Sequence, residues 1–190
     1  TEGQFTACST EDWLARPGTV GRARPDRRLH VDDGVIWCEV PPRARFEYWR
    51  DPERTASAWR GDAFTVGDLG RLDDDGYLYL DGRRDDLIIT GGVNVYPVEV
   101  EHVLVAAPGV REVAVFGVDD DRWGQRVCAA IVGDADIDEV RAHARAHLAA
   151  YKCPKDLYRL DELPHTSTGK LQRLALAPAL GLGSSVTPGR

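Results

Sequence analysis

The chain has 190 residues, of which 43% are hydrophobic and 29% are charged, and its formal net charge is −7. This length permits one or two domains with a buried core. The acidic balance, without a basic stripe, argues against nucleic acid or an anionic membrane surface as the main partner. No signal peptide or membrane-spanning stretch is evident, and four scattered cysteines without a CxxC pair indicate a reduced, cytoplasmic protein. The chain contains no methionine and begins at Thr1, which is typical of a processed product or a fragment.

Two hairpins are expected in the first half of the chain. Residues 28–41 alternate loosely between apolar and polar side chains around a tight turn at Asp32-Asp33-Gly34. In the second hairpin, Leu72 and the apolar run at 77–80 flank the sequence DDDG, with Asp75-Gly76 as the turn. The acidic triplet lacks the alternating ligands and the distal glutamate of a calcium loop, so a solvated turn is favoured over a cation site.

The stretch from Gly82 to Glu101 reads GRRDDLIITGGVNVYPVEVE. It combines a polar run, a short apolar strand at Leu87–Thr90, a break at two adjacent glycines and a helix that begins at Pro97. Adjacent glycines after a strand indicate positive φ or a close approach of the backbone. Proline is favoured at the first helical position, and the helix is expected to stop before Pro108-Gly109.

The second half of the chain alternates strands and helices. Two nearly continuous apolar runs, 110–118 and 126–132, predict buried strands. A second helix is expected from Asp136, which has the capping-box spacing to Glu139. His143 and His147 lie four residues apart on this helix, but no HExxH glutamate or third ligand accompanies them, so an exposed helix face is favoured over a zinc site. Strands and helices together predict a small α+β domain.

Three segments stand in the order of known family motifs: FTVGDLG at 64–70, the stretch at 82–101, and LPHTSTGKLQR at 163–173. The GK pair of the last one does not fit a P-loop, because the places of the required Gly and Ser or Thr hold other residues. Over residues 1–178 the chain resembles AMP-forming acyl-CoA synthetases of the adenylate-forming enzyme superfamily. The resemblance implies their C-terminal portion only. Its expected parts are the β-rich last part of the large domain at 1–82, a hinge at 83–85, a small mobile α+β domain at 86–178 and a disordered tail at 179–190.

The resemblance also implies roles in nucleotide chemistry. Lys170 would be the catalytic lysine that spans the substrate carboxylate and the α-phosphate of ATP. Asp68 would accept hydrogen bonds from both ribose hydroxyls, which suits a carboxylate because it only accepts. Arg83 would reach the ribose or the phosphates, as a guanidinium fork can. Asp85 would be the hinge residue, whereas Asp86 is expected to be a surface charge.

Further roles concern Mg²⁺ and CoA. Thr1 and Glu2 match the end of a motif whose residues meet the nucleotide phosphates and the bound Mg²⁺. The resemblance implies that CoA contacts a loop formed by Gly91, Gly92 and Asn94. It also implies contacts of CoA with the side chains of Trp123, Tyr151 and Lys155. For Trp123, covering the core of the small domain is an equal alternative, and for Tyr151 and Lys155 taken singly surface packing is favoured.

The implied reaction joins a carboxylic acid to CoA. Acid and ATP, with Mg²⁺, give an acyl-adenylate and pyrophosphate, and the CoA thiol then gives the thioester and AMP. In the family, the phosphate loop, most of the adenine site and the acyl pocket precede the place of Thr1, so the chain alone is expected to be inactive. The alternative is a non-catalytic module that complements a separate large domain.

Overall fold

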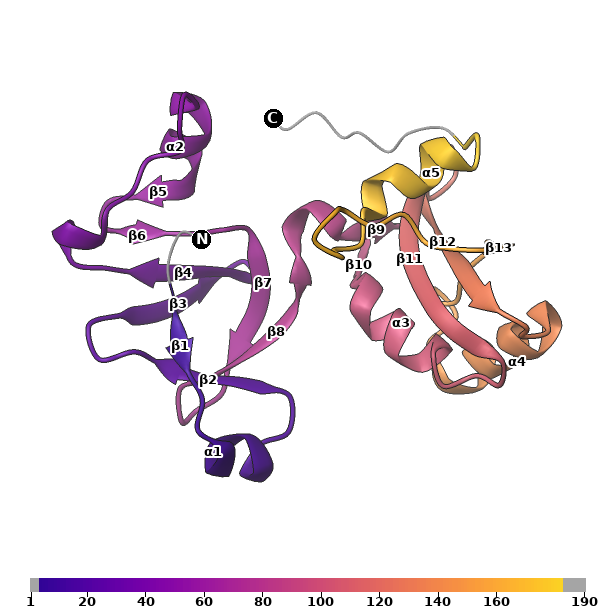
Figure 1. Ribbon diagram of the computed structural model, residues 1–190, viewed down its shortest axis with the longest axis horizontal. Coiled ribbons are helices and arrows are strands. Elements are labelled where there is room, and N and C mark those ends of the chain that lie inside the picture. Colours follow the sequence, from indigo (N-terminus) through magenta and orange to yellow (C-terminus); the bar gives the residue numbers. More distant parts are fainter. Residues whose placement is uncertain (1–3, 183–190) are drawn as a thin grey trace. The chain divides into compact units, whose positions relative to one another are not determined.

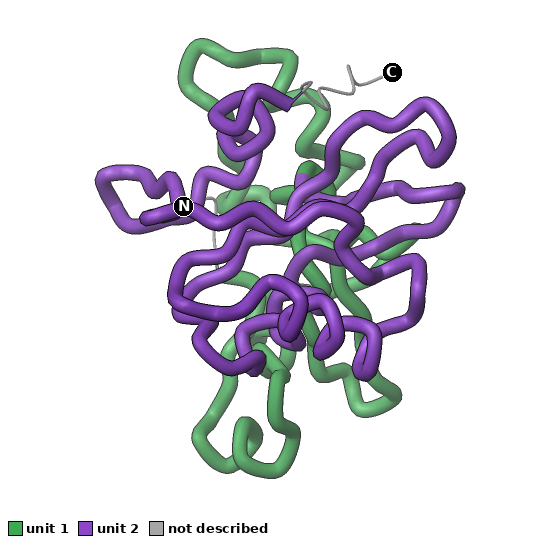
Figure 2. The backbone as a smooth tube through the Cα atoms, turned by 90° about the vertical axis from the view of Figure 1, so that its right-hand side faces the viewer, with its two compact units in different colours: residues 1–85 green, residues 86–190 purple. Residues whose placement is uncertain are grey.

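The protein, seen in a computed structural model that describes residues 4–182, divides into two compact units between Asp85 and Asp86 (Figures 1 and 2). One unit carries an eight-stranded sheet and the other a five-stranded sheet, and helices accompany both. This is the α+β class that the sequence predicts. Among the described residues, no helix has the length and apolar character needed to cross a membrane.

The first unit is dominated by antiparallel strands. They run in the order β1-β2-β8-β7-β4-β6-β5, and β3 pairs with β4. The strands are β1 (Thr6–Ala7), β2 (Thr19–Ala23), β3 (Arg28–Asp32), β4 (Val35–Glu39), β5 (Trp59–Arg60), β6 (Ala63–Phe64), β7 (Asp68–Leu72) and β8 (Tyr77–Arg83). The helical elements are α1 (Thr10–Ala15), the 3-10 turn η1 (Pro42–Ala44) and α2 (Pro52–Ala58), while the 3-10 turn η2 (Arg84–Asp86) spans the boundary of the two units.

Both hairpins predicted for this unit are confirmed. Between β3 and β4, Asp33 and Gly34 have φ of 49° and 76°, which is the positive backbone torsion that a two-residue hairpin turn needs. Between β7 and β8, Leu72 pairs with Leu78 and the turn glycine has φ of 81°. The core of the unit includes the fully buried Phe64, which other aromatic rings surround.

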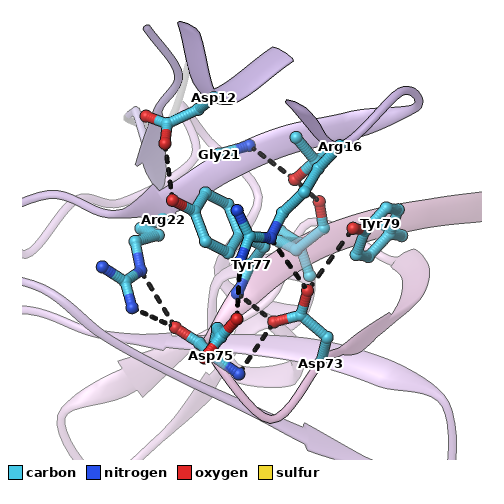
Figure 3. A network of polar contacts seen from close by, with 10 residues as sticks. Asp12, Arg16, Gly21, Arg22, Asp73, Asp75, Tyr77 and Tyr79 are labelled. Carbon is cyan, nitrogen blue, oxygen red and sulfur yellow. Dashed lines mark hydrogen bonds and ion pairs between the residues drawn. The ribbon is translucent and has the colours of Figure 1, made fainter. Parts of the chain in front are cut away.

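The acidic turn before β8 is held by a polar network (Figure 3). Oδ1 of Asp73 accepts hydrogen bonds from the backbone N–H groups of Asp75, at 3.1 Å, and Tyr77, at 2.8 Å. The hydrogen bond from Tyr77 is the main reason why the pKa of Asp73 lies below its ordinary value. The guanidinium groups of Arg16 and Arg22 lie over the Tyr77 ring, 4.2 and 4.7 Å from its centroid. The triplet is therefore a structural turn that is tied to α1 and β2.

The second unit contains both helices and both long strands that the sequence predicts. Its elements are β9 (Ile88–Thr90), β10 (Val93–Val95), α3 (Pro97–Leu104), β11 (Val110–Asp120), β12 (Gly124–Gly133), α4 (Ile137–His147), β13 (Asp156–Arg159), the 3-10 turn η3 (Arg173–Ala175) and α5 (Leu176–Ala179). The strand order is β10-β9-β12-β11, and β13 pairs in addition with β12, to which it runs parallel. The short strands β10 and β13 were not predicted.

Strand β12 is buried on both faces, which explains its continuous apolar sequence. Val127, Ala129 and Ile131 pack with α3 and α4 in one cluster. Cys128 and Ala130 point to the other face, where they pack in a second cluster that includes α5. Successive side chains of a strand point to opposite faces, so a strand between two helical layers buries the side chains of both faces and is apolar throughout.

The disordered tail predicted for residues 179–190 does not begin where the sequence suggested. Helix α5 ends at Ala179, and Leu180 and Leu182 pack, partly buried, against the cluster around the fully buried Leu176. The burial of these leucines against the apolar cluster on the sheet favours an ordered segment, although its glycine-rich composition favours disorder. The remaining residues of the predicted tail, 183–190, lie outside the described residues.

Candidate active site

The residues predicted to meet the ribose of ATP lie on neighbouring strands of the first unit. Asp68 begins β7 and Arg83 ends β8, and the two are direct partners across the antiparallel pair. Nε of Arg83 lies 3.3 Å from Oδ1 of Asp68, and the two side chains are 66% and 28% exposed. An accepting carboxylate and a donating guanidinium fork are thus presented side by side, a combination suited to hydroxyl groups and phosphate oxygens.

The segment before this carboxylate is shaped by Gly67. Its φ is 80°, and no atom lies within 4 Å of the place that a Cβ would take. Its N–H donates to Oγ1 of Thr65 at 3.1 Å, and its carbonyl accepts from the N–H of Arg84 at 2.8 Å. Glycine is therefore needed here for its backbone torsion and not for close approach.

Three other predicted residues belong to the start and the end of the first unit. Thr1 and Glu2, the candidates for the phosphates and Mg²⁺, lie outside the described residues. Asp85 is exposed within η2 and is the last residue of the unit. The division of the chain falls directly after it, and its role as a hinge stays a prediction.

The glycine pair forms a two-residue turn between β9 and β10. Gly91 and Gly92 have φ of 58° and 79°, and Thr90 pairs with Val93 across the turn, as in a type I′ hairpin. The N–H of Gly91 donates to the carbonyl of Trp123 at 2.8 Å. A Cβ on Gly91 would lie 3.2 Å from Cε3 of the Trp123 ring, whereas one on Gly92 would meet nothing within 4 Å.

The prediction that Asn94 belongs to the same loop was wrong. Asn94 lies in β10, opposite Ile89, and its side chain is exposed. The chain resumes strand pairing at once after two glycines because a type I′ turn needs only two residues. Asn94 therefore shares a regular hairpin with the glycines and is held by backbone pairing.

Trp123 lies at the surface beside the glycine turn. The residue is 41% exposed, and its backbone N–H donates to Oδ1 of Asp120 at 3.0 Å. The guanidinium of Arg122 lies 4.7 Å from the ring centroid. Of the two alternatives, the structure thus favours an exposed ring over a cover for the core of the unit.

Tyr151 and Lys155 flank the segment between α4 and β13, and both are exposed. The Nζ atom of Lys152 lies 5.8 Å from the centroid of the Tyr151 ring. Lys155 borders a groove of about 430 Å³ that runs along α4. Apolar residues and three cationic side chains line the groove, namely Arg141, Ala144, Arg145, Leu148, Ala150, Cys153, Pro154, Lys155 and Leu157. Tyr151 is not among its lining residues.

Lys170 closes a compact turn that we call the lysine turn (residues 166–170). The N–H of Thr166 donates to the carbonyl of Lys170 at 2.8 Å, and the N–H of Lys170 donates to Oγ1 of Thr166 at 3.1 Å. The hydroxyl groups of Thr166 and Thr168 are 2.9 Å apart, and Gly169 has φ of 79°. The threonines and the glycine of the motif build the turn, which leaves the Lys170 side chain exposed.

The expectation that Asp86 is a surface charge was wrong. Oδ2 of Asp86 lies 2.6 Å from Nη1 of Arg173, and the two side chains are only 22% and 12% exposed. Arg173 also contacts Glu101, at 2.7 Å. Sequence reasoning assigned no role to Arg173 or Glu101. Each is the last residue of a motif, and this position could have indicated that both have a specific role.

The histidine pair of α4 is engaged in local contacts. Nε2 of His143 lies 3.1 Å from the carbonyl oxygen of Val103 in α3, and Nδ1 of His147 lies 2.9 Å from the carbonyl oxygen of His143. His143 is thus partly buried against α3, and only His147 is exposed as expected. Within residues 4–182, no group of three or more His, Cys, Asp or Glu side chains could hold a metal ion.

Comparison with known proteins extends these observations. The family model "AMP-binding enzyme C-terminal domain" matches residues 99–170. The long-chain-fatty-acid–CoA ligase FadD13 of Mycobacterium tuberculosis is 39% identical over 186 residues, which cover 92% of this chain and 37% of that ligase. The 2-succinylbenzoate–CoA ligase of Geobacillus sp. is 44% identical over 186 residues, which cover 91% of this chain and 38% of that ligase.

A solved structure shows the same similarity in three dimensions. The o-succinylbenzoate CoA synthetase (MenE) of Bacillus subtilis, in complex with its acyl-adenylate intermediate, matches with a TM-score of 0.83 at 32% identity. The match covers 92% of this chain and 38% of that one. The chain thus spans well under half of the length of the relatives that it matches.

Proposed function

We propose that this chain, whose residues 99–170 match the AMP-binding enzyme C-terminal domain, is the C-terminal part of an acid–CoA ligase. The reaction would activate a carboxylic acid with ATP to an acyl-adenylate and then transfer the acyl group to the thiol of CoA. The observation that carries the proposal is the pairing of Asp68 with Arg83, two motif residues that lie opposite each other at an accessible strand end. This pairing occurs in a chain whose curated relatives are CoA ligases.

In the adenylation step, the first unit would orient the nucleotide. The carboxylate of Asp68 can accept hydrogen bonds from both hydroxyls of the ribose, and Arg83 can donate to the ribose or to a phosphate. Mg²⁺ would accompany ATP and neutralise phosphate charge. The residues proposed to meet the phosphates and the ion, Thr1 and Glu2, lie outside the described residues.

Lys170 would supply charge to the same step. Its ammonium group stands on a flexible side chain at the end of a hydrogen-bonded turn, so it can follow negative charge as it develops on the substrate carboxylate and the α-phosphate. Because positioned charges of this kind act mainly on the transition state, we expect Lys170 to raise the rate of adenylation more than the affinity for ATP.

The thioester step would use other exposed groups of the second unit. The Gly91-Gly92 turn gives a narrow backbone surface past which a thin pantetheine chain could run, and Asn94 offers an amide beside it. Trp123 and Tyr151 present exposed rings that suit stacking, and Lys155 presents an ammonium group for a phosphate. These residues are our candidates for the CoA contacts.

The two steps need the second unit in two orientations if Lys170 serves one and the glycine turn the other. We propose Asp85 as the hinge, because the chain divides directly after this exposed residue. The required partner is the large domain of the family. It would be supplied by the same polypeptide, or by a separate one if the chain is a complementing module.

The proposal is tested by ATP–pyrophosphate exchange with a panel of fatty and aryl acids. The 190-residue chain alone should show no acid-dependent exchange, because one ribose carboxylate and one lysine cannot position a triphosphate. The parent protein, or the chain with an added large domain, should show exchange and should form thioester from acid, ATP and CoA. Exchange by the isolated chain above that of a Lys170→Ala control would contradict the expected inactivity. Failure of the complete protein with every acid would contradict the ligase assignment.

A further inference from the structure

Arg173 uses all three nitrogens of its guanidinium group. Nε donates to the carbonyl oxygen of Val115 at 2.8 Å, Nη1 to Asp86 at 2.6 Å and Nη2 to Glu101 at 2.7 Å. The same oxygen of Glu101 also accepts the backbone N–H of Val115 at 2.7 Å. The side chains of Arg173, Asp86 and Glu101 are 12%, 22% and 16% exposed. One guanidinium is therefore matched to two carboxylates and a carbonyl group in a place that is largely shielded from water.

Such a network contributes geometry more than stability. Burying charges costs desolvation free energy, and clusters of this kind can often be replaced by apolar residues without loss of stability. A planar guanidinium with three fixed partners, however, has one allowed orientation. Here it joins η2, α3, the middle of β11 and η3, and the partners Asp86 and Glu101 are 87 and 72 residues away along the chain.

The segment that this network can fix is the lysine turn. Arg173 lies three residues after Lys170, and the N–H of Gln172 donates to the carbonyl of Pro164 at 2.8 Å, which closes the base of the turn. On the side before the turn, the buried Leu163 holds the chain to the unit. On the side after it, Leu171 packs, partly buried, against the apolar cluster on the sheet. Arg173 is then the first residue whose side chain ties the turn by hydrogen bonds to η2, to α3 and to β11.

We propose that Arg173 is a positioning residue for Lys170, which it serves by holding the lysine turn in one place on the second unit. This inference rests on the proposed role of Lys170 in adenylation. A long, flexible side chain can deliver its charge to a reacting atom only if its own backbone is held, and displacements of about 1 Å can be costly. Because Asp86 directly follows Asp85, the same guanidinium also makes the lysine turn and the start of the second unit move as one body.

The first test uses the 190-residue chain. Arg173→Lys keeps the charge but loses the fork, and Glu101→Gln removes one carboxylate; each should loosen the lysine turn. We expect NMR order parameters of the amides of residues 166–170 to fall from about 0.85 to below about 0.6. The matched control is Arg126→Lys, because Nε of Arg126 makes a comparable ion pair with Asp156, at 2.8 Å, in the same unit. This control should leave the order of the lysine turn unchanged.

The second test measures both half-reactions in the parent protein. Arg173→Lys should lower kcat of adenylation by about tenfold or more with KM for ATP nearly unchanged, and should spare thioester formation from a supplied acyl-adenylate. An ordered turn with normal adenylation in Arg173→Lys, or equal loss in both half-reactions, would overturn the positioning role. If Lys170→Ala itself leaves adenylation intact, the proposed function of Lys170 fails instead, and the order parameters still decide whether Arg173 holds the turn.

Discussion

The second unit presents two exposed turns that differ in how they are built. The glycine turn (Gly91-Gly92) is determined by its own backbone, because two positive φ angles join strands that pair directly on either side. The lysine turn closes through its own threonine hydroxyl and backbone groups, but Arg173 ties it to partners far along the chain. A turn that presents only backbone can be built locally, whereas a turn that presents a charged side chain needs an anchor.

This difference suggests a division of work. A glycine turn offers a smooth, narrow surface and makes little demand on the precision of side chains, which suits the proposed passage of a pantetheine chain. A catalytic ammonium group must be held to within a fraction of an ångström, which calls for support from more than one element. The comparison can be tested by changing each turn separately and measuring which half-reaction responds.

The largest effect is expected for Lys170→Ala in the parent protein. Removal of a group that stabilises transition-state charge should reduce the rate of adenylation by about 10²-fold to 10³-fold. Thioester formation from a supplied acyl-adenylate should survive, since the glycine turn is intact. Pre-steady-state assays of each half-reaction make the measurement, and an equal loss in both would show that the two turns do not divide the work.

The next effect concerns the residue between the two units. Proline fixes φ near −65° and restricts the residue before it, so Asp85→Pro should trap one orientation and slow one half-reaction by about tenfold or more. Asp85→Ala, which keeps the backbone free, serves as the control and should be mild. If Asp85→Pro behaves like the wild-type protein in both half-reactions, Asp85 is not the hinge.

A smaller effect should separate the two glycines. Alanine at either position must adopt a left-handed backbone, which costs about 1–2 kcal/mol of folding stability. Gly91→Ala should cost more than Gly92→Ala, because only its Cβ would press on the ring of Trp123, at 3.2 Å. Urea unfolding of both variants measures the difference, and in a Trp123→Ala background the two costs should become equal. Equal costs with Trp123 present would show that the ring yields freely.

The smallest effect is expected at the acidic turn of the first unit. Hydrogen bonds from the backbone lower the pKa of Asp73 in the folded state. Its contribution to stability is therefore complete above the unfolded pKa of about 4 and is lost as pH falls through the folded value. Asp73→Asn should flatten the decline of unfolding free energy below about pH 4. Asp74→Asn, which changes an exposed neighbour, is the control. If the unfolding free energy of both variants depends on pH in the same way, the lowered pKa of Asp73 does not contribute to stability.

Much of the local structure could be predicted from sequence because it depends on near neighbours. Asp33-Gly34 and Gly76 specify their hairpin turns through positive φ, and Asp136 caps α4 by accepting the backbone N–H groups of Asp138 and Glu139. The order of the motifs also pointed to the similarity with CoA ligases that the comparisons found. In the two hairpins and in the cap of α4, the interacting residues lie within a few positions of each other. The sequence pattern therefore predicts the local structure correctly.

Only the tertiary structure decided the features that depend on distant partners. Asp86 reads as one more surface acid until Arg173 is folded onto it across 87 residues, and Leu180 and Leu182 read as part of a tail until the open face of the sheet requires cover. In the same way, the pairing of Asp68 with Arg83 depends on the register of β7 and β8. The free energy of such contacts comes from removing charge or apolar surface from water, and the sequence pattern does not say which two distant surfaces will meet.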